Sequence, residues 1–150
     1  MAAEVQAKLK GGEFLITASD PQDVFTPEDF TEEHQMIAQT AQQFMEQDVL
    51  PQCEQIEDQD LDLTVGLLRK AATELDLLAI DVPEKYEGLG LDKPSSTIVA
   101  EKLSRVGSFA ISYGAHCGIG TLPIVYFEPK NRNNNTFPSW PRGSSLPPTP

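Results

Sequence analysis

The residues of this chain whose types could carry chemistry include one histidine–cysteine pair. His116 and Cys117 are neighbours in the sequence, and a histidine beside a cysteine can activate a thiolate nucleophile. Adjacent side chains on a helix, however, point about 100° apart, so this pair does not form a ready-made nucleophile and base. We therefore predict that His116 is a satisfied histidine in the core or in a cavity wall.

Two other segments could bind ions. The segment 58–62 (DQDLD) begins like a calcium-binding loop. Its sixth position is Leu63, where that loop needs glycine, and its twelfth is Arg69, where it needs a bidentate glutamate. We predict a solvated acidic run and no metal ligand. The segment 88–90 (GLG) is too short to predict a phosphate-binding loop.

Composition restricts the partners and the compartment. The net charge of −12 disfavours nucleic acids and anionic membranes as partners. Cys53 and Cys117 have neither metal-site nor redox spacing, so we predict free thiols in a reducing compartment. The N-terminus has no apolar signal core, and Glu4 without an early arginine argues against a transit peptide. The predicted location is the cytoplasm.

Residues 109–127 lie within the longest uncharged run and are long enough to span a membrane. They contain Gly114, Gly118, Gly120 and Pro123, which favour a buried core helix over a span. A short membrane-associated protein remains a third interpretation of the chain.

Capped, periodic segments predict an all-α fold, because strand alternation is scarce. A chain of 150 residues suffices for one domain with one core. The predicted caps and inward residues are Thr31 with Ile37, Ala41, Phe44 and Met45; Thr64 with Leu68, Ala71, Ala72 and Leu75; Ser95 or Ser96 with Val99 and Leu103; and Ser108 with the stripe Ala110, Gly114 and Gly118. The first helix is predicted to end near Leu50, with His34 exposed and an acidic connection over 54–62.

The loop between the second and third helices, 79–91 (AIDVPEKYEGLGL), is rich in helix breakers. Pro83 fixes its own φ and disfavours the helical region for Val82. Gly88 and Gly90 permit a positive φ or the close approach of another backbone. Taken alone, the loop is a long connection between helices.

With its neighbours, this loop resembles a segment of the acyl-CoA dehydrogenase family. Residues 74–78 (ELDLL), the loop, 98–105 (IVAEKLSR) and 112–124 (SYGAHCGIGTLPI) follow that family's motifs in order. The resemblance covers 25–127 and implies a helical bundle of the family's N-terminal domain type. Asp76 and Glu87 stand where the family usually has glycine, and Glu87 would cost on the order of 1 kcal/mol if its φ is positive.

The resemblance implies flavin-dependent Cα–Cβ desaturation of an acyl-CoA, as in fatty acid β-oxidation. A glutamate takes the α-proton and a hydride passes to FAD; electron-transferring flavoprotein and homo-oligomerisation are implied for the complete enzyme. The base and the main flavin contacts lie beyond this segment, so no catalytic or cofactor-binding residue is predicted here, and FAD is not expected to bind the chain alone. Whether the chain is an enzyme stays open. The resemblance places Tyr113, Gly114, Ala115 and Gly118 at the floor of the acyl-chain cavity, although tight helix packing explains the same glycines equally well.

The composition changes after Phe127. Residues 1–127 contain no asparagine, whereas the tail 128–150 has four asparagines and six of the 12 prolines. Reading the tail with one base restored after the Phe127 codon yields GTEEQKQQYLPKLATGELVAAYA, which resembles the family's continuation. We predict a flexible lead-in (1–27), a helical domain (28–127) and a disordered, frame-shifted tail (128–150). The alternative function is a non-catalytic acidic helical interaction module.

Overall fold

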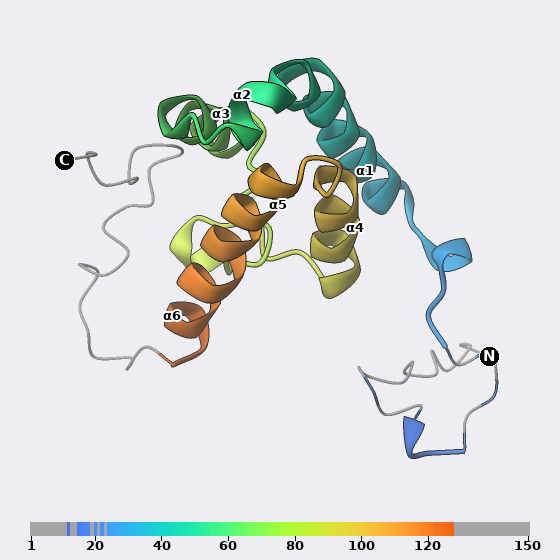
Figure 1. The fold of residues 1–150 in the computed structure, drawn as a ribbon. Coiled ribbons are helices and arrows are strands. Elements are labelled where there is room, and N and C mark those ends of the chain that lie inside the picture. The colour runs from blue at the N-terminus through green and yellow to red at the C-terminus, as the bar shows by residue number, and fades with distance from the viewer. Residues whose placement is uncertain (1–11, 13–14, 19, 21, 23, 128–150) are drawn as a thin grey trace. The chain divides into compact units, whose positions relative to one another are not determined.

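The computed structural model describes residues 12, 15–18, 20, 22 and 24–127, in which helices are joined by loops of different length (Figure 1). No strand occurs among these residues, so the predicted all-α fold class is confirmed. The chain divides into two compact units, Met1–Glu33 and His34–Pro150. The predicted tail lies outside the described residues, and so does most of the predicted lead-in.

In the first unit, the chain makes a 3₁₀ turn at Pro27–Asp29. The Asp29 carboxylate accepts a hydrogen bond from the Thr26 N–H at 2.9 Å, and the rings of Phe25 and Phe30 lie 6.0 Å apart. This small aromatic and polar cluster immediately precedes the first long helix.

The described part of the chain contains six α-helices with 3₁₀ and π-helical segments between them. In chain order they are α1 (Glu32–Phe44), a π-helical segment (Met45–Val49), a 3₁₀ turn (Leu50–Gln52), α2 (Cys53–Glu57), α3 (Leu61–Thr73), a 3₁₀ turn (Glu84–Tyr86), α4 (Lys93–Leu103), α5 (Gly107–Gly114), a second π-helical segment (Ala115–Thr121) and α6 (Leu122–Phe127). From α5 to α6 the helical backbone is continuous, because the residues at both junctions keep right-handed helical φ and ψ.

The chain stays helical beyond the predicted end of the first helix. The acidic connection predicted over 54–62 is wrong in its first half, because α2 continues to Glu57. Pro51 does not stop the helix because it lies in the first turn of the 3₁₀ segment, where the missing N–H is tolerated. Ile56 on α2 is 1% exposed, so this short helix contributes directly to the core.

Three predicted caps lie two to four residues after the observed N-cap positions, and carboxylates accept the N–H groups in their place. Asp60 caps α3 by accepting the Leu63 N–H at 3.0 Å. Asp92 caps α4 in the same way. At α5 the predicted cap Ser108 lies inside the helix, and the Glu57 carboxylate of α2 accepts its N–H and its hydroxyl at 3.1 and 2.7 Å. A carboxylate carries a full charge, which suits the positive end of a helix dipole.

The core contains most of the predicted inward residues. Ala41, Phe44, Met45, Leu68, Ala71, Val99 and Leu103 are buried, and Ile37, Ala72 and Leu75 are partly buried against them. The rings of Phe44 and Phe109 lie 5.9 Å apart and join α1 to α5. Helix periodicity was therefore sufficient to find the buried faces of α1, α3 and α4, whereas the buried residues of α5 are Phe109 and Tyr113.

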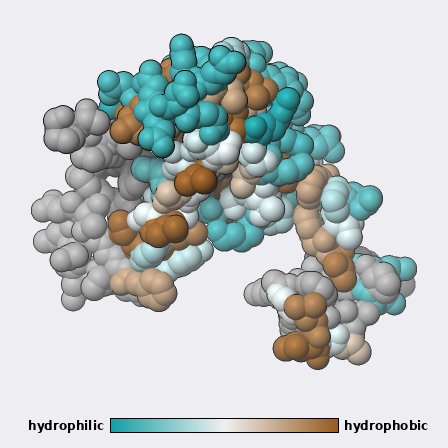
Figure 2. Space-filling model, in the orientation of Figure 1, coloured by the Kyte–Doolittle hydropathy of each residue, from teal (hydrophilic) through white to brown (hydrophobic). Residues whose placement is uncertain are grey.

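The surface is uneven in polarity. Figure 2 shows hydrophilic residues over α1 to α3 and hydrophobic patches over α5 and α6. The exposed apolar side chains there include Ile111, Ile119, Tyr126 and Phe127, which are 60 to 82% exposed. The helices with the most exposed apolar surface are those that carry the predicted site.

Candidate functional site

The site depends first on the loop between α3 and α4, which folds back on itself. The Leu89 N–H donates to the Ala79 carbonyl at 3.0 Å, and the Gly90 N–H donates to the Val82 carbonyl at 2.8 Å. Positive φ occurs at Asp76 (53°), Glu87 (62°) and Gly90 (59°), so the left-handed conformations suspected at Asp76 and Glu87 are present.

Gly88 confirms the predicted close approach of two backbones. An added Cβ at this glycine would lie 2.0 Å from the Val82 carbonyl oxygen, so no other residue fits without displacing the loop. This tight loop fixes the carbonyls of Leu77 and Leu78 and the side chain of Asp81, all of which meet the next helices.

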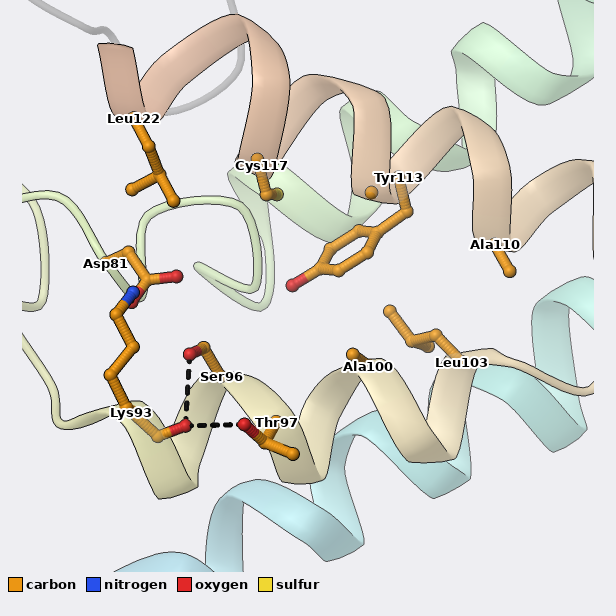
Figure 3. Close-up of a pocket in the computed structure, with 12 residues that line it drawn as sticks. Asp81, Lys93, Ser96, Thr97, Ala100, Leu103, Ala110, Tyr113, Cys117 and Leu122 are labelled. Atoms are coloured by element: carbon orange, nitrogen blue, oxygen red, sulfur yellow. Dashed lines mark hydrogen bonds and ion pairs between the residues drawn. The ribbon is translucent and has the colours of Figure 1, made fainter. Parts of the chain in front are cut away.

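A cavity of about 370 Å³ lies between α4 and the continuous helix from α5 to α6, which we call the α4/α5 cavity (Figure 3). Ala100 and Leu103 of α4 and Ala110 of α5 form its apolar part, while Ser96 and Thr97 are more polar. The hydroxyls of both polar residues are hydrogen-bonded to the Lys93 carbonyl. Most of the wall is therefore apolar or already hydrogen-bonded.

Three of the four residues predicted at an acyl-chain floor meet in this cavity. Tyr113, Gly114 and Gly118 line it, whereas Ala115 is exposed and lies outside its lining. A Cβ added to Gly114 or Gly118 would find no atom within 4 Å, so the space beside both glycines is open. The smooth stripe expected from their spacing thus faces a real cavity.

Tyr113 and Cys117 line the cavity with uncharged polar groups. The Tyr113 hydroxyl donates to the Leu77 carbonyl at 2.8 Å, and burial raises the pKa of this phenol. Burial also raises the pKa of the Cys117 thiol to about 12, and its sulfur lies 3.8 Å from the Leu78 carbonyl oxygen. Both groups stay protonated at neutral pH, so Cys117 offers no thiolate nucleophile there.

His116 is half-buried and does not line the cavity. Burial lowers the pKa of its imidazole, so the ring is neutral at pH 7. Its carbonyl accepts the Thr121 hydroxyl at 2.7 Å, five residues along the chain, within the π-helical segment. His116 therefore lies neither among the buried core residues nor in the lining of the α4/α5 cavity, and the prediction that placed it there is wrong.

An ion pair that sequence analysis missed lies at the end of the cavity away from Ala110 and Leu103 (Figure 3), which we call its mouth because Lys93 is exposed there. The Lys93 ammonium donates to the Asp81 carboxylate at 2.5 Å, and their side chains are 60% and 15% exposed. Burial lowers the pKa of Lys93, but the hydrogen bond and charge of Asp81 outweigh it and raise the pKa overall. No periodic pattern links the two residues, so the sequence carried no signal for this pair.

His34 is the clearest error of the sequence prediction. The structure buries it to 5% exposure, whereas an exposed side chain was predicted. Its Nε2 lies 3.1 and 3.0 Å from the two carboxylate oxygens of Asp92. A partner 58 residues away cannot be read from local patterning, which is why the buried position was missed.

In the part of the chain that the structure describes, no helix is long and apolar enough to cross a membrane. Within the same residues, no three histidine, cysteine or acidic side chains gather closely enough to hold a metal ion.

Comparison with known proteins decides the family. The sequence model of the family described as "Acyl-CoA dehydrogenase, N-terminal domain" matches residues 31–138. This chain belongs to the acyl-CoA dehydrogenase family. The match begins one residue before α1 and extends eleven residues past the end of α6. As an acyl-CoA dehydrogenase N-terminal domain, the chain has the helical fold that its motifs implied.

Similar acyl-CoA dehydrogenases are much longer than this chain. A probable acyl-CoA dehydrogenase of Bacillus subtilis (strain 168) is 51% identical over 145 residues, which are 97% of this chain and 24% of that protein. The mitochondrial short-chain specific acyl-CoA dehydrogenase of Mus musculus is 38% identical over 82% of this chain and 30% of its own length. The chain thus spans about a quarter to a third of these relatives.

A solved structure shows the same fold. The acyl-CoA dehydrogenase from Bacillus anthracis, complexed with FAD, is 50% identical, with a TM-score of 0.80 over 90% of this chain and 23% of that one.

The α4/α5 cavity of this chain does not itself fit FAD. A dinucleotide pyrophosphate needs converging N–H donors or cations, and the Lys93 ammonium at this cavity is already paired with Asp81.

Proposed function

We propose that this chain supplies part of the acyl-chain wall of a flavin-dependent acyl-CoA dehydrogenase, which desaturates acyl-CoA at Cα–Cβ in fatty acid β-oxidation. The observation that carries the proposal is the α4/α5 cavity with Gly114 and Gly118 open toward it. Tyr113 lines the same wall, and Ala115 contributes the neighbouring exposed face of the same helix.

The residues of the cavity suit an aliphatic chain. Tyr113 and Cys117 carry no charge at neutral pH because burial raises the pKa of both groups. Each buried methylene of an acyl chain contributes about 0.8 kcal/mol to binding when water is excluded from such a wall. The two glycines set the room available, since a larger side chain at either position would fill the space that the chain needs.

Catalysis itself is assigned to the parts of the enzyme that this chain lacks. No Asp or Glu lies within 109–127 to take an α-proton, and Asp81 at the cavity mouth is bound to Lys93. FAD, when bound to the complete enzyme, supplies the hydride acceptor. The 150-residue chain alone should be colourless and inactive. Electron-transferring flavoprotein as electron acceptor, a homo-oligomeric complete enzyme and a cytoplasmic location complete the proposal.

A chimaera tests the role of the cavity. Residues 28–127 replace the matching segment of the Bacillus anthracis enzyme, which is 50% identical to this chain. The chimaera should bind FAD and bleach it on addition of an acyl-CoA. Gly118→Leu should then lower kcat/KM for long-chain acyl-CoA far more than for short-chain acyl-CoA, because the added side chain enters the cavity.

Gly66→Leu is the matched control. Gly66 is an exposed helical glycine on α3 with no atom within 4 Å of an added Cβ, and it does not line the cavity. It should leave the chain-length profile unchanged. An unchanged profile in the Gly118→Leu chimaera would exclude the cavity as an acyl site, and stoichiometric flavin in the 150-residue chain would contradict the assignment of catalysis to the missing parts.

A further inference from the structure

The bond between His34 and Asp92 ties the start of α1 to the start of α4. The two side chains are 6% and 54% exposed, and Nε2 of His34 lies about equally far from both carboxylate oxygens. A carboxylate can only accept hydrogen bonds, so Nε2 must carry a hydrogen and donate it to Asp92. The Asp92 carboxylate thus assigns a hydrogen to the Nε2 atom of His34.

The same carboxylate organises the first turn of α4. Asp92 accepts the Ser95 N–H at 3.0 Å and the Ser95 hydroxyl at 2.7 Å. Burial raises the pKa of Asp92, but the hydrogen bonds from Ser95 and His34 outweigh it and lower the pKa overall. Asp92 therefore remains a carboxylate at neutral pH and holds donors from two helices at once.

The first turn of α4 also forms the mouth of the α4/α5 cavity. Lys93 follows Asp92 directly and pairs with Asp81 across the mouth. One turn further along, Ser96 and Thr97 line the cavity, as Figure 3 shows. Lys93, Ser96 and Thr97 lie in the first five residues of α4. A small rotation of the start of this helix would therefore move all three side chains together.

A cap alone does not explain the histidine. Asp92 can cap α4 through Ser95 without any help from α1. Burying an imidazole costs free energy that an apolar side chain of similar size would not incur, unless its polar atoms are bonded. The bond to α1 therefore adds a constraint on where α4 begins, beyond the constraint that the helix is capped.

We propose that His34 is a positioning residue of the α4/α5 cavity: by holding Asp92, it fixes the first turn of α4 and with it the Asp81–Lys93 pair at the mouth. The role in substrate binding rests on the proposed function of the cavity, whereas the role in placing α4 does not. The two parts are therefore tested by separate measurements.

Hydrogen exchange in the full 150-residue chain tests the placement of α4. His34→Leu removes the donor and Asp92→Asn removes the charge while keeping a capping oxygen. Both should speed exchange of the Ser95 and Ser96 amides, relative to amides of α3, by about tenfold or more. His34→Gln, whose amide N–H can reach the same carboxylate, should stay within about threefold of the parent chain.

Thr64→Val is the control for general loss of stability. Thr64 is 8% exposed, and its hydroxyl donates to the Asp60 carbonyl at 2.9 Å at the start of α3. It should not speed exchange in α4 relative to α3. The placement role is refuted if His34→Leu leaves amide exchange in α4, relative to α3, unchanged. It is also refuted if Thr64→Val and His34→Gln raise this relative exchange as much as His34→Leu does.

Kinetics of the chimaera test the link to the cavity. His34→Leu should raise KM for an acyl-CoA severalfold with little change in kcat, and His34→Gln should restore KM. Faster exchange in α4 with an unchanged KM would refute the link to the cavity. Failure of the proposed function would give a different result. Gly118→Leu would not change the dependence of kcat/KM on acyl-chain length, whereas His34→Leu would still speed hydrogen exchange in α4.

Discussion

Gly88→Ala is predicted to be among the most damaging single-methyl changes in the domain. The new Cβ would lie 2.0 Å from the carbonyl oxygen of Val82, 2.4 Å from its Cβ and 2.5 Å from its carbonyl carbon. Val82 is 2% exposed, so it has no free space into which to retreat. The loop must therefore open, and the Val82 carbonyl must move away from the Gly90 N–H that it accepts at 2.8 Å.

The magnitude follows from these contacts. Forcing an extra methyl into a packed site costs about 1–3 kcal/mol, and each lost backbone hydrogen bond costs about 1 kcal/mol more. We expect a loss of about 3 kcal/mol in the free energy of unfolding. For a domain of this size, such a loss lowers Tm by more than about 10 °C.

Urea and thermal unfolding, followed by circular dichroism at 222 nm, measure the effect. Gly66→Ala is the control, because it adds the same methyl to an exposed helical glycine with no neighbour within 4 Å. That control should stabilise the domain by about 0.5–1 kcal/mol through helix propensity. The reasoning is refuted if Gly88→Ala changes the free energy by less than about 1 kcal/mol, or if both substitutions shift it in the same direction.

Three further predictions concern single groups. Glu87→Gly should raise the free energy of unfolding by about 0.5–1 kcal/mol, because it relieves a φ of 62°; unchanged urea midpoints would contradict it. Hydrogen bonds from the side chain and backbone of Ser108 lower the pKa of Glu57, so its contribution to stability is present above pH 4.5 and is lost as the pH falls through the lowered pKa. Glu57→Gln should flatten that part of a stability-against-pH curve, and an identical acid slope would show that the bond is unimportant. Cys117 should react with iodoacetamide far more slowly in the folded chain than in urea, because burial raises its pKa to about 12. Mass spectrometry of the peptide that contains Cys117 measures the alkylation rate, and equal rates in both conditions would argue against a buried thiol.

Local patterning predicted the helices and their inward faces because both depend on the spacing of apolar residues on neighbouring helical turns. Val99 and Leu103 on α4 were found this way, and both are fully buried. The left-handed positions at Asp76 and Glu87 were suspected because the family that the chain resembles usually has glycine at both. Such features are encoded within a few residues of where they act.

The remaining features depend on contacts between distant segments. His34 is buried because Asp92, 58 residues away, accepts its hydrogen bond. Glu57 holds the N-terminal turn of α5 from a different helix, and Lys93 meets Asp81 only because the intervening loop folds back. The cavity itself arises from how two helices lie together, which spacing along either helix does not reveal.

The π-helical segment Ala115–Thr121 has a consequence for how this helix tolerates changes in length. Each residue of an α-helix turns the chain by about 100°, and a π-helical turn accommodates an additional residue without breaking the helix. Deleting one residue while the segment reverts to regular α-helix would leave Leu122 and the rest of α6 facing nearly the same way, whereas regular α-helix over all seven residues would swing them by roughly 100°. Leu122 lines the cavity opposite α4, so the segment acts as a spacer that sets which side of α6 faces inward. Sequence change in this region must therefore preserve the match between the number of residues and the type of helix, more than the identity of the side chains.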